Sequence, residues 1–129
     1  VKPAERRDFD HAVQKFRDRD FRACIAELDS FKKAWPNSAF LPNVDYWRAS
    51  SYYALSDFKS TSKIAANMIR LYPKSPKVPE AYLLKASADL SDGNIEAAKT
   101  SLNQIVKRFP KSDQAKTAKE RLKQIAEIK

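Results

Sequence analysis

The feature that most constrains the fold of this chain is a four-residue motif that returns at a fixed interval. The motif is aromatic-Pro-x-Ser, and it begins at Trp35, Tyr72 and Phe109, so that each copy follows the last by 37 residues. Self-similarity at a period of about 20 to 50 residues is typical of proteins built from stacked repeats. The spacing therefore predicts a row of similar units, each packed on its neighbours, rather than one central core.

Each unit has the pattern of two antiparallel helices. An Asp or Asn, which commonly caps a helix N-terminus, precedes an apolar residue at Asp20, Asp57 and Asn94. Gly93 stands just before the third cap, where a left-handed residue is wanted, and the residue before each motif proline is driven out of helical geometry. The expected first helices are 5–18, 43–55 and 78–91, and the expected second helices are 21–35, 58–72 and 94–109.

These helices predict an all-α fold, a tetratricopeptide-like right-handed superhelix of three helix-turn-helix repeats plus a C-terminal capping helix. We expect a single repeat domain over 1–129, with repeat 1 at about 5–38, repeat 2 at about 39–75, repeat 3 at about 76–112 and the capping helix at about 113–128. The serine of each motif is expected to cap the next helix, either directly or after a short extended link.

The net charge of +9 admits an acidic partner, nucleic acid or an anionic membrane surface. Basic residues gather between Lys107 and Lys123, but only Phe109 stands beside them as a stacking group. Nucleic acid is therefore not the favoured partner, and the basic helix is interpreted as a solvated face. The chain has no run of 18 apolar residues, so we expect no membrane span, and a signal peptide is expected to lie outside this chain.

The sequence offers little for catalysis. His11 is the one histidine, with Asp8 a turn away and no further ligand at metal-binding spacing. Cys24 aligns with Thr61 and Ala98, which marks a small-residue position between helices. A single glycine excludes a glycine-rich phosphate loop. We expect no catalytic, cofactor-binding or metal site and predict that the chain is not an enzyme.

The unit resembles the tetratricopeptide repeat, whose usual length is about 34 residues, but it is longer and closes on Tyr-Pro-x-Ser. The segments that carry a closer likeness are Tyr46–Phe58, Tyr72–Ala81 and Phe109–Leu122. Together they resemble the C-terminal repeat domain of the Tol-Pal-associated periplasmic cell-division coordinator, the YbgF/CpoB family. This resemblance implies a non-catalytic periplasmic adaptor of Gram-negative bacteria that binds TolA, a peptidoglycan synthase or both, linking the Tol-Pal system to peptidoglycan synthesis during cell division.

Two alternatives stay open. The Asn43–Tyr46 run is similar to one in the repeat lipoprotein of the outer-membrane barrel-assembly machinery, and a generic tetratricopeptide scaffold would satisfy the same pattern. The YbgF/CpoB family also carries an N-terminal coiled coil that this chain lacks. Oligomerisation through such a segment is therefore possible outside this sequence.

A partner segment would lie in the groove that the first helices line. By analogy with tetratricopeptide repeats, the groove positions are Phe9, Val13, Phe16, Tyr46, Ser50, Tyr53, Leu83, Ser87 and Gln124. Tyr46, Tyr53 and Trp47 are of the rigid aromatic type enriched in binding hot spots, and Arg48 can offer a charge to an acidic partner. The same apolar stripe can also be packing core, the favoured interpretation for Phe9 and Phe16. Arg48 and Lys85 replace the usual leucine, which leaves the groove face undecided.

Overall fold

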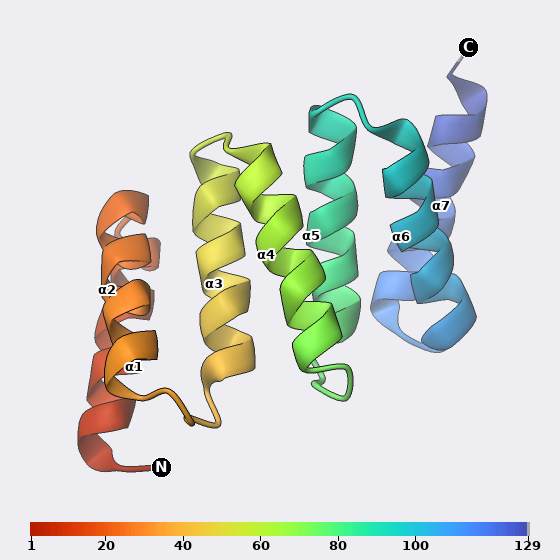
Figure 1. Ribbon diagram of the computed structural model, residues 1–129. Helices are drawn as coiled ribbons and strands as arrows, with labels where there is room; N and C mark the ends of the chain where they lie inside the picture. Colours follow the sequence, from red (N-terminus) through yellow and green to blue (C-terminus); the bar gives the residue numbers. More distant parts are fainter. Residues whose placement is uncertain (129) are drawn as a thin grey trace.

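The computed structural model describes residues 1–128, which form seven α-helices and no strand. Three helix pairs follow one another along the chain, and a last helix closes the row (Figure 1). The helices are α1 (Pro3–Arg17), α2 (Phe21–Ala34), α3 (Leu41–Ala54), α4 (Phe58–Leu71), α5 (Val78–Ser91), α6 (Ile95–Arg108) and α7 (Asp113–Glu127).

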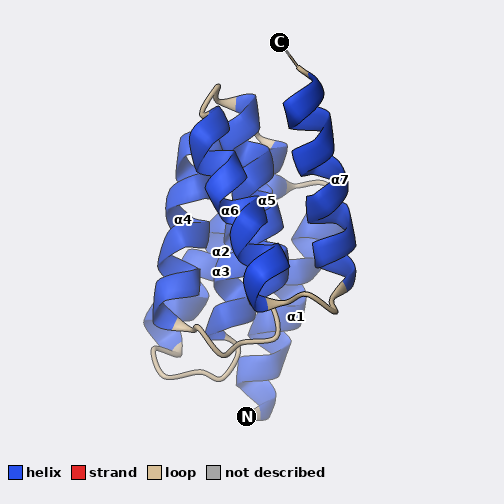
Figure 2. Cartoon of the chain, turned by 90° about the vertical axis from the view of Figure 1, so that its right-hand side faces the viewer, coloured by secondary structure: helices blue, strands red, loops and turns tan. Residues whose placement is uncertain are grey.

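The helices form two layers. The first helices of successive units, α1, α3 and α5, and then α7, each contact the next one along the row. The second helices α2, α4 and α6 pack only on the first helices beside them and do not contact one another. In Figure 2, α4 and α6 lie on one side of the molecule and α7 on the other. This arrangement confirms the predicted tetratricopeptide-like all-α fold.

The turn inside each unit has the same backbone geometry three times. Arg19, Ser56 and Gly93, spaced by 37 residues, have φ of 63°, 61° and 81°. The following residue in each turn donates its backbone N–H to a carbonyl five positions earlier; for Asn94 this bond to Asp89 is 2.7 Å. Such a left-handed residue with a returning hydrogen bond is a common way to end a helix. The turn fixes the antiparallel pairing of the two helices in every unit.

The aromatic-Pro-x-Ser motif forms the link between units. In all three copies the serine N–H donates to the aromatic residue's carbonyl at 3.0 to 3.1 Å. The Ser112 hydroxyl accepts from the Ala115 N–H at 3.0 Å and so caps α7 directly. The Ser38 hydroxyl instead accepts from the Phe40 N–H, and Ser75 from the Lys77 N–H, so α3 and α5 begin three residues after the motif. The predicted serine cap therefore occurs on α7 alone, because the N-cap residues of α3 and α5, Phe40 and Lys77, have no side-chain capping hydrogen bond.

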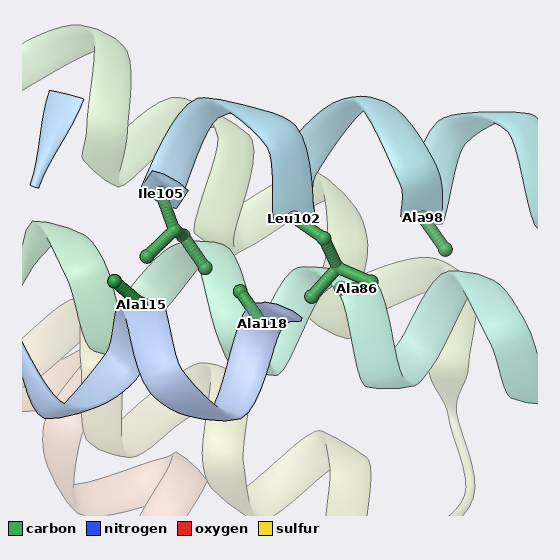
Figure 3. Close-up of a cluster of buried hydrophobic side chains, with 6 residues drawn as sticks. All are labelled: Ala86, Ala98, Leu102, Ile105, Ala115 and Ala118. Atoms are coloured by element: carbon green, nitrogen blue, oxygen red, sulfur yellow. The ribbon is translucent and has the colours of Figure 1, made fainter. Parts of the chain in front are cut away.

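Alanines allow close helix packing where the units meet. One buried cluster joins α5, α6 and α7 and contains Ala86, Leu102, Ile105, Ala115 and Ala118, with Ala98 beside them (Figure 3). A second cluster of Ala12, Cys24, Leu28, Phe31 and Val44 joins α1, α2 and α3. The core thus runs along the row of helices, as a stacked array requires. None of the helices among residues 1–128 is long and apolar enough to cross a membrane.

Candidate protein-binding site

The first helices build a wall along one side of the stack. The Phe16 ring of α1 meets the Trp47 ring of α3 edge-on, with centroids 4.8 Å apart. Two units further along, Arg121 Nη1 of α7 donates to Ser87 Oγ of α5 at 2.7 Å. These contacts join neighbouring first helices directly. A partner lying across this wall would therefore meet several units at once.

The three predicted groove residues on α1 are packed in the protein. The Phe9 ring stacks on Phe40 at 4.6 Å and meets Phe31 edge-on at 6.1 Å. Phe16 meets Phe21 as well as Trp47, and Val13 is buried. Phe9 and Phe16 are half-buried and hold α1 against α2 and α3, and Val13 has little free surface.

The candidates on α3 are half-buried. The Tyr46 ring lies 5.0 Å from Lys77 Nζ, an arrangement that attracts a cation to the ring face. Burial raises the pKa of the Tyr46 phenol and the charge of Glu80 adds to this, while a hydrogen bond with Ser50 opposes them. Tyr53 meets Phe58 edge-on at 5.4 Å, repeating the Phe16–Phe21 contact one unit later. Tyr46, Ser50 and Tyr53 thus show part of their surface on α3, while their remaining surface is packed.

A hollow of about 420 Å³ opens beside Tyr46, where α3 and α5 begin. Its lining is mixed in polarity and consists of Ala39, Pro42, Asn43, Ser75, Pro76, Lys77 and Glu80. Lys77 belongs both to this lining and to the Tyr46 contact, and its ammonium lies 3.3 Å from Glu80 Oε2. The hollow presents one cation and one anion to a partner segment.

The predicted groove residues on α5 and α7 have different surroundings. Leu83 packs against the buried cluster of α5, α6 and α7. Ser87 is engaged by Arg121. Gln124 is exposed on α7, one turn after Arg121. Arg121 was not among the predicted groove residues, although Gln124 of the same helix was.

Arg48 lies toward α2. Arg48 Nε donates to Asp29 Oδ1 at 2.8 Å and Nη1 donates to Asp45 Oδ1 at 3.1 Å, while Lys32 Nζ donates to the same Asp45 oxygen at 2.9 Å. The Asp45 side chain is only 4 % exposed, so this charged group is part of the α2–α3 packing. Lys85, one repeat later, pairs with Asp89 of its own helix at 2.8 Å. The two departures from leucine are therefore accommodated by carboxylates rather than by a change of buried face.

The remaining reactive groups have structural surroundings. His11 Nδ1 contacts Glu27 Oε1 rather than Asp8, which accepts a hydrogen bond from Trp35 Nε1 at 3.0 Å. Cys24 is fully buried, and burial raises the pKa of its thiol. Within residues 1–128, no group of three or more His, Cys, Asp or Glu side chains is placed to hold a metal ion.

The fold and its wall of first helices place the chain among the tetratricopeptide-like helical scaffolds that bind other proteins. More narrowly, the YfiO family model, described as outer membrane lipoprotein, matches residues 4–128, and the chain belongs to that family. No curated protein matches the chain at a significant level.

Proposed function

We propose that this chain is a non-catalytic scaffold of the Gram-negative cell envelope that holds partner proteins against its row of first helices. The observation that carries this proposal is the unbroken wall from α1 to α7, in a chain whose family match covers residues 4–128. Family membership favours a periplasmic position at the outer membrane and a role in assembling outer-membrane barrels.

The Tol-Pal adaptor is the second candidate. Its support is the Tyr72–Ala81 link and the Tyr46–Phe58 run, which resemble the cell-division coordinator. In that case the partners are TolA and a peptidoglycan synthase. Both candidates use the same wall, with Tyr46, Ser50, Tyr53 and Ser87 as the contact residues and Arg48 in a supporting role through the α2–α3 packing.

The test is a quantitative pull-down from envelope extract with the purified chain as bait. Ser50→Arg projects a long side chain from the wall, whereas Ser30→Arg makes the same change on the exposed face of α2. We expect barrel-assembly proteins to be retained by the unaltered chain and by Ser30→Arg, and lost with Ser50→Arg. Retention of TolA or a peptidoglycan synthase instead would favour the second candidate. Equal retention by all three baits would contradict binding at the wall.

A further inference from the structure

The α2–α3 pair and the α4–α5 pair carry opposite chemistry at equivalent positions. In the α2–α3 pair, four positions carry the ion-paired group described above: Asp29, Lys32, Asp45 and Arg48. The residues 37 positions later, in the α4–α5 pair, are Ala66, Ile69, Tyr82 and Lys85. Three of the four charges are thus replaced by small or largely apolar side chains.

The replacement leaves an open groove. A space of about 370 Å³ lies between α4 and α6 over α5, and we call it the α4–α6 groove. Its lining is Ala66, Ile69, Tyr82, Lys85, Ala97, Thr100, Ser101 and Gln104. The groove has α4 and α6 as its sides and α5 beneath it, so it lies on the second-helix layer, away from the first-helix wall.

Cations border this groove. Lys63 and Arg70 are exposed on α4 about one turn before and after Ala66, which places them on the same helical face. Arg108 of α6 donates to the Tyr82 hydroxyl at 3.0 Å, and its guanidinium lies 6.0 Å from that ring's centroid. The segment from Phe58 to Pro79 contains no Asp or Glu.

The acids nearest to the groove do little to balance this charge. Asp89 is paired with Lys85 at 2.8 Å. Glu96 is exposed at the start of α6, one turn before Thr100, and is 3.5 Å from Lys99. The groove therefore combines an apolar floor with a positive border, and electrostatic complementarity calls for an anionic occupant.

We propose that the α4–α6 groove binds an acidic segment of a partner protein, with one bulky apolar side chain of that segment seated on Ala66, Ile69 and Ala97. A recessed apolar anchor surrounded by charged contacts is a common form of protein recognition. This surface is distinct from the wall proposed above, so the scaffold would hold two partners on opposite sides.

The test uses three synthetic peptides of equal length, observed by fluorescence anisotropy and by amide chemical shifts of the ¹⁵N-labelled chain. The first has a central Phe flanked by glutamates, the second replaces the Phe by Gly, and the third replaces the glutamates by Gln. We expect the first peptide alone to bind, with shifts concentrated at Ala66, Ile69, Ala97 and Thr100. Ser50→Arg on the first-helix wall leaves this binding unchanged, which separates it from the function proposed above.

The repeat supplies a matched control for charge. Arg70→Glu and Lys33→Glu make the same change at equivalent, exposed positions of α4 and α2, and only the first borders the groove. We expect Arg70→Glu to weaken binding about tenfold or more, as for a close charge pair across an interface. We expect Lys33→Glu to change it by less than about twofold, as for a border charge outside the contact. Ala66→Asp, which places a carboxylate at the position equivalent to Asp29 of α2, should abolish binding while circular dichroism shows unchanged helicity.

Four outcomes would overturn the proposal. These are equal loss in Arg70→Glu and Lys33→Glu, equal binding by the Gly-containing peptide, shifts concentrated at Tyr46, Ser50 and Tyr53 of the first-helix wall, and no binding of the Phe-containing peptide at millimolar concentration. Vesicles of anionic phospholipid form a further arm. If they bind the chain with equal sensitivity to Arg70→Glu and Lys33→Glu, while the Phe-containing peptide does not bind, the charged face serves a membrane surface and the peptide groove is rejected.

Discussion

Three residues spaced by one repeat adopt a left-handed backbone, and only Gly93 among them lacks a β-carbon. Arg19 and Ser56 are held at φ near 60° by the hydrogen bonds of the turn. A residue with a side chain is less stable in this backbone region by about 1 to 2 kcal/mol. Glycine avoids this strain, but it loses more conformational freedom on folding, which offsets part of the advantage. The geometry of the repeat therefore outweighs local preference at two of its three turns.

Ser56→Gly should stabilise the chain by about 0.5 to 1 kcal/mol, because it removes the strain of the turn and leaves the hydrogen bonds in place. Gly93→Ser should destabilise it by a similar amount. No atom lies within 4 Å of the position that a β-carbon would occupy at Gly93, so this loss would come from the backbone alone. Urea unfolding of the two variants measures both effects. Destabilisation by Ser56→Gly would contradict this account.

The residues after these turns differ in how they cap the second helices. The Asp57 carboxylate accepts from the Ser60 N–H at 3.1 Å, whereas the Asn94 side chain makes no capping hydrogen bond. Asp57→Ala should therefore cost about 1 kcal/mol, the usual value of a helix cap. Asn94→Ala should cost clearly less. Equal losses in chemical denaturation would show that the Asn94 amide caps α6 in solution.

Glu5 connects helix α1 to the first link between units. Its carboxylate accepts from the Ser38 hydroxyl and, at 3.2 Å, from the Lys2 N–H. The hydrogen bond from Ser38, followed by that from Lys2, holds the pKa of Glu5 below its ordinary value. A carboxylate with a lowered folded-state pKa contributes stability above its unfolded pKa and loses it as the pH falls through the folded one.

The stability difference between the unaltered chain and Glu5→Gln should thus be constant near neutral pH and shrink below about pH 4. Thermal unfolding at a series of pH values measures this difference. Ser38→Ala removes the first of the two donors to Glu5. In a chain with Ser38→Ala, the loss of stability caused by Glu5→Gln should therefore be smaller at neutral pH. A difference that does not change with pH would contradict the assigned role of Glu5.

At the scale of elements, α2 and α3 are joined by ion pairs around the buried Asp45 carboxylate. Asp45 accepts from both Lys32 and Arg48, so Asp45→Ala would leave two partly exposed cations with fewer partners. We expect a loss of about 1 to 3 kcal/mol, the usual scale for removing a hydrogen-bonded charged partner. The α4–α5 packing does without these charges, since it has Ile69 and Tyr82 at the equivalent positions.

The double variant Asp45→Tyr with Lys32→Ile should therefore recover more than half of that loss, because well-packed apolar groups often replace a buried ion pair without penalty. Arg48 keeps Asp29 as its partner in this variant. Urea unfolding of Asp45→Ala and of the double variant gives the comparison. A double variant less stable than Asp45→Ala would show that the charges are required for this packing.

The sequence predicted the helices and their connections, whereas the partners of individual side chains are given by the structure. Helix positions, turns and links follow from local signals such as Asp57, Gly93 and Pro73, which act within a few residues. The orientation of Arg48 could not be predicted from local signals, because its partner Asp29 belongs to another helix. The α4–α6 groove is lined by residues from three helices, α4, α5 and α6. In the sequence, only the alignment of Asp29 with Ala66 and of Asp45 with Tyr82 would have indicated it.

At the scale of the whole molecule, each unit contacts only its neighbours, so stability should be transmitted over short distances. Ala118 of α7 is fully buried with Ala86 of α5. Ala118→Gly should destabilise the C-terminal end by about 1 to 2 kcal/mol, through helix propensity and one lost methyl contact. Hydrogen exchange should accelerate in α5, α6 and α7 and change little in α1 and α2. Equal acceleration along the whole chain would instead indicate a single cooperative unit.

The different chemistry of the α2–α3 and α4–α5 contacts also bears on how the chain avoids assembling in the wrong order. Three units of one length and one turn geometry could pair out of sequence, within one molecule or between two. If α2 packed on α5 in place of α3, Lys32 would face Tyr82 and lose Asp45. Such a mispaired form would leave a charge without its partner in a largely apolar contact, which is costly. The ion-paired group between α2 and α3 thus favours the packing of α2 on α3 over its packing on α5.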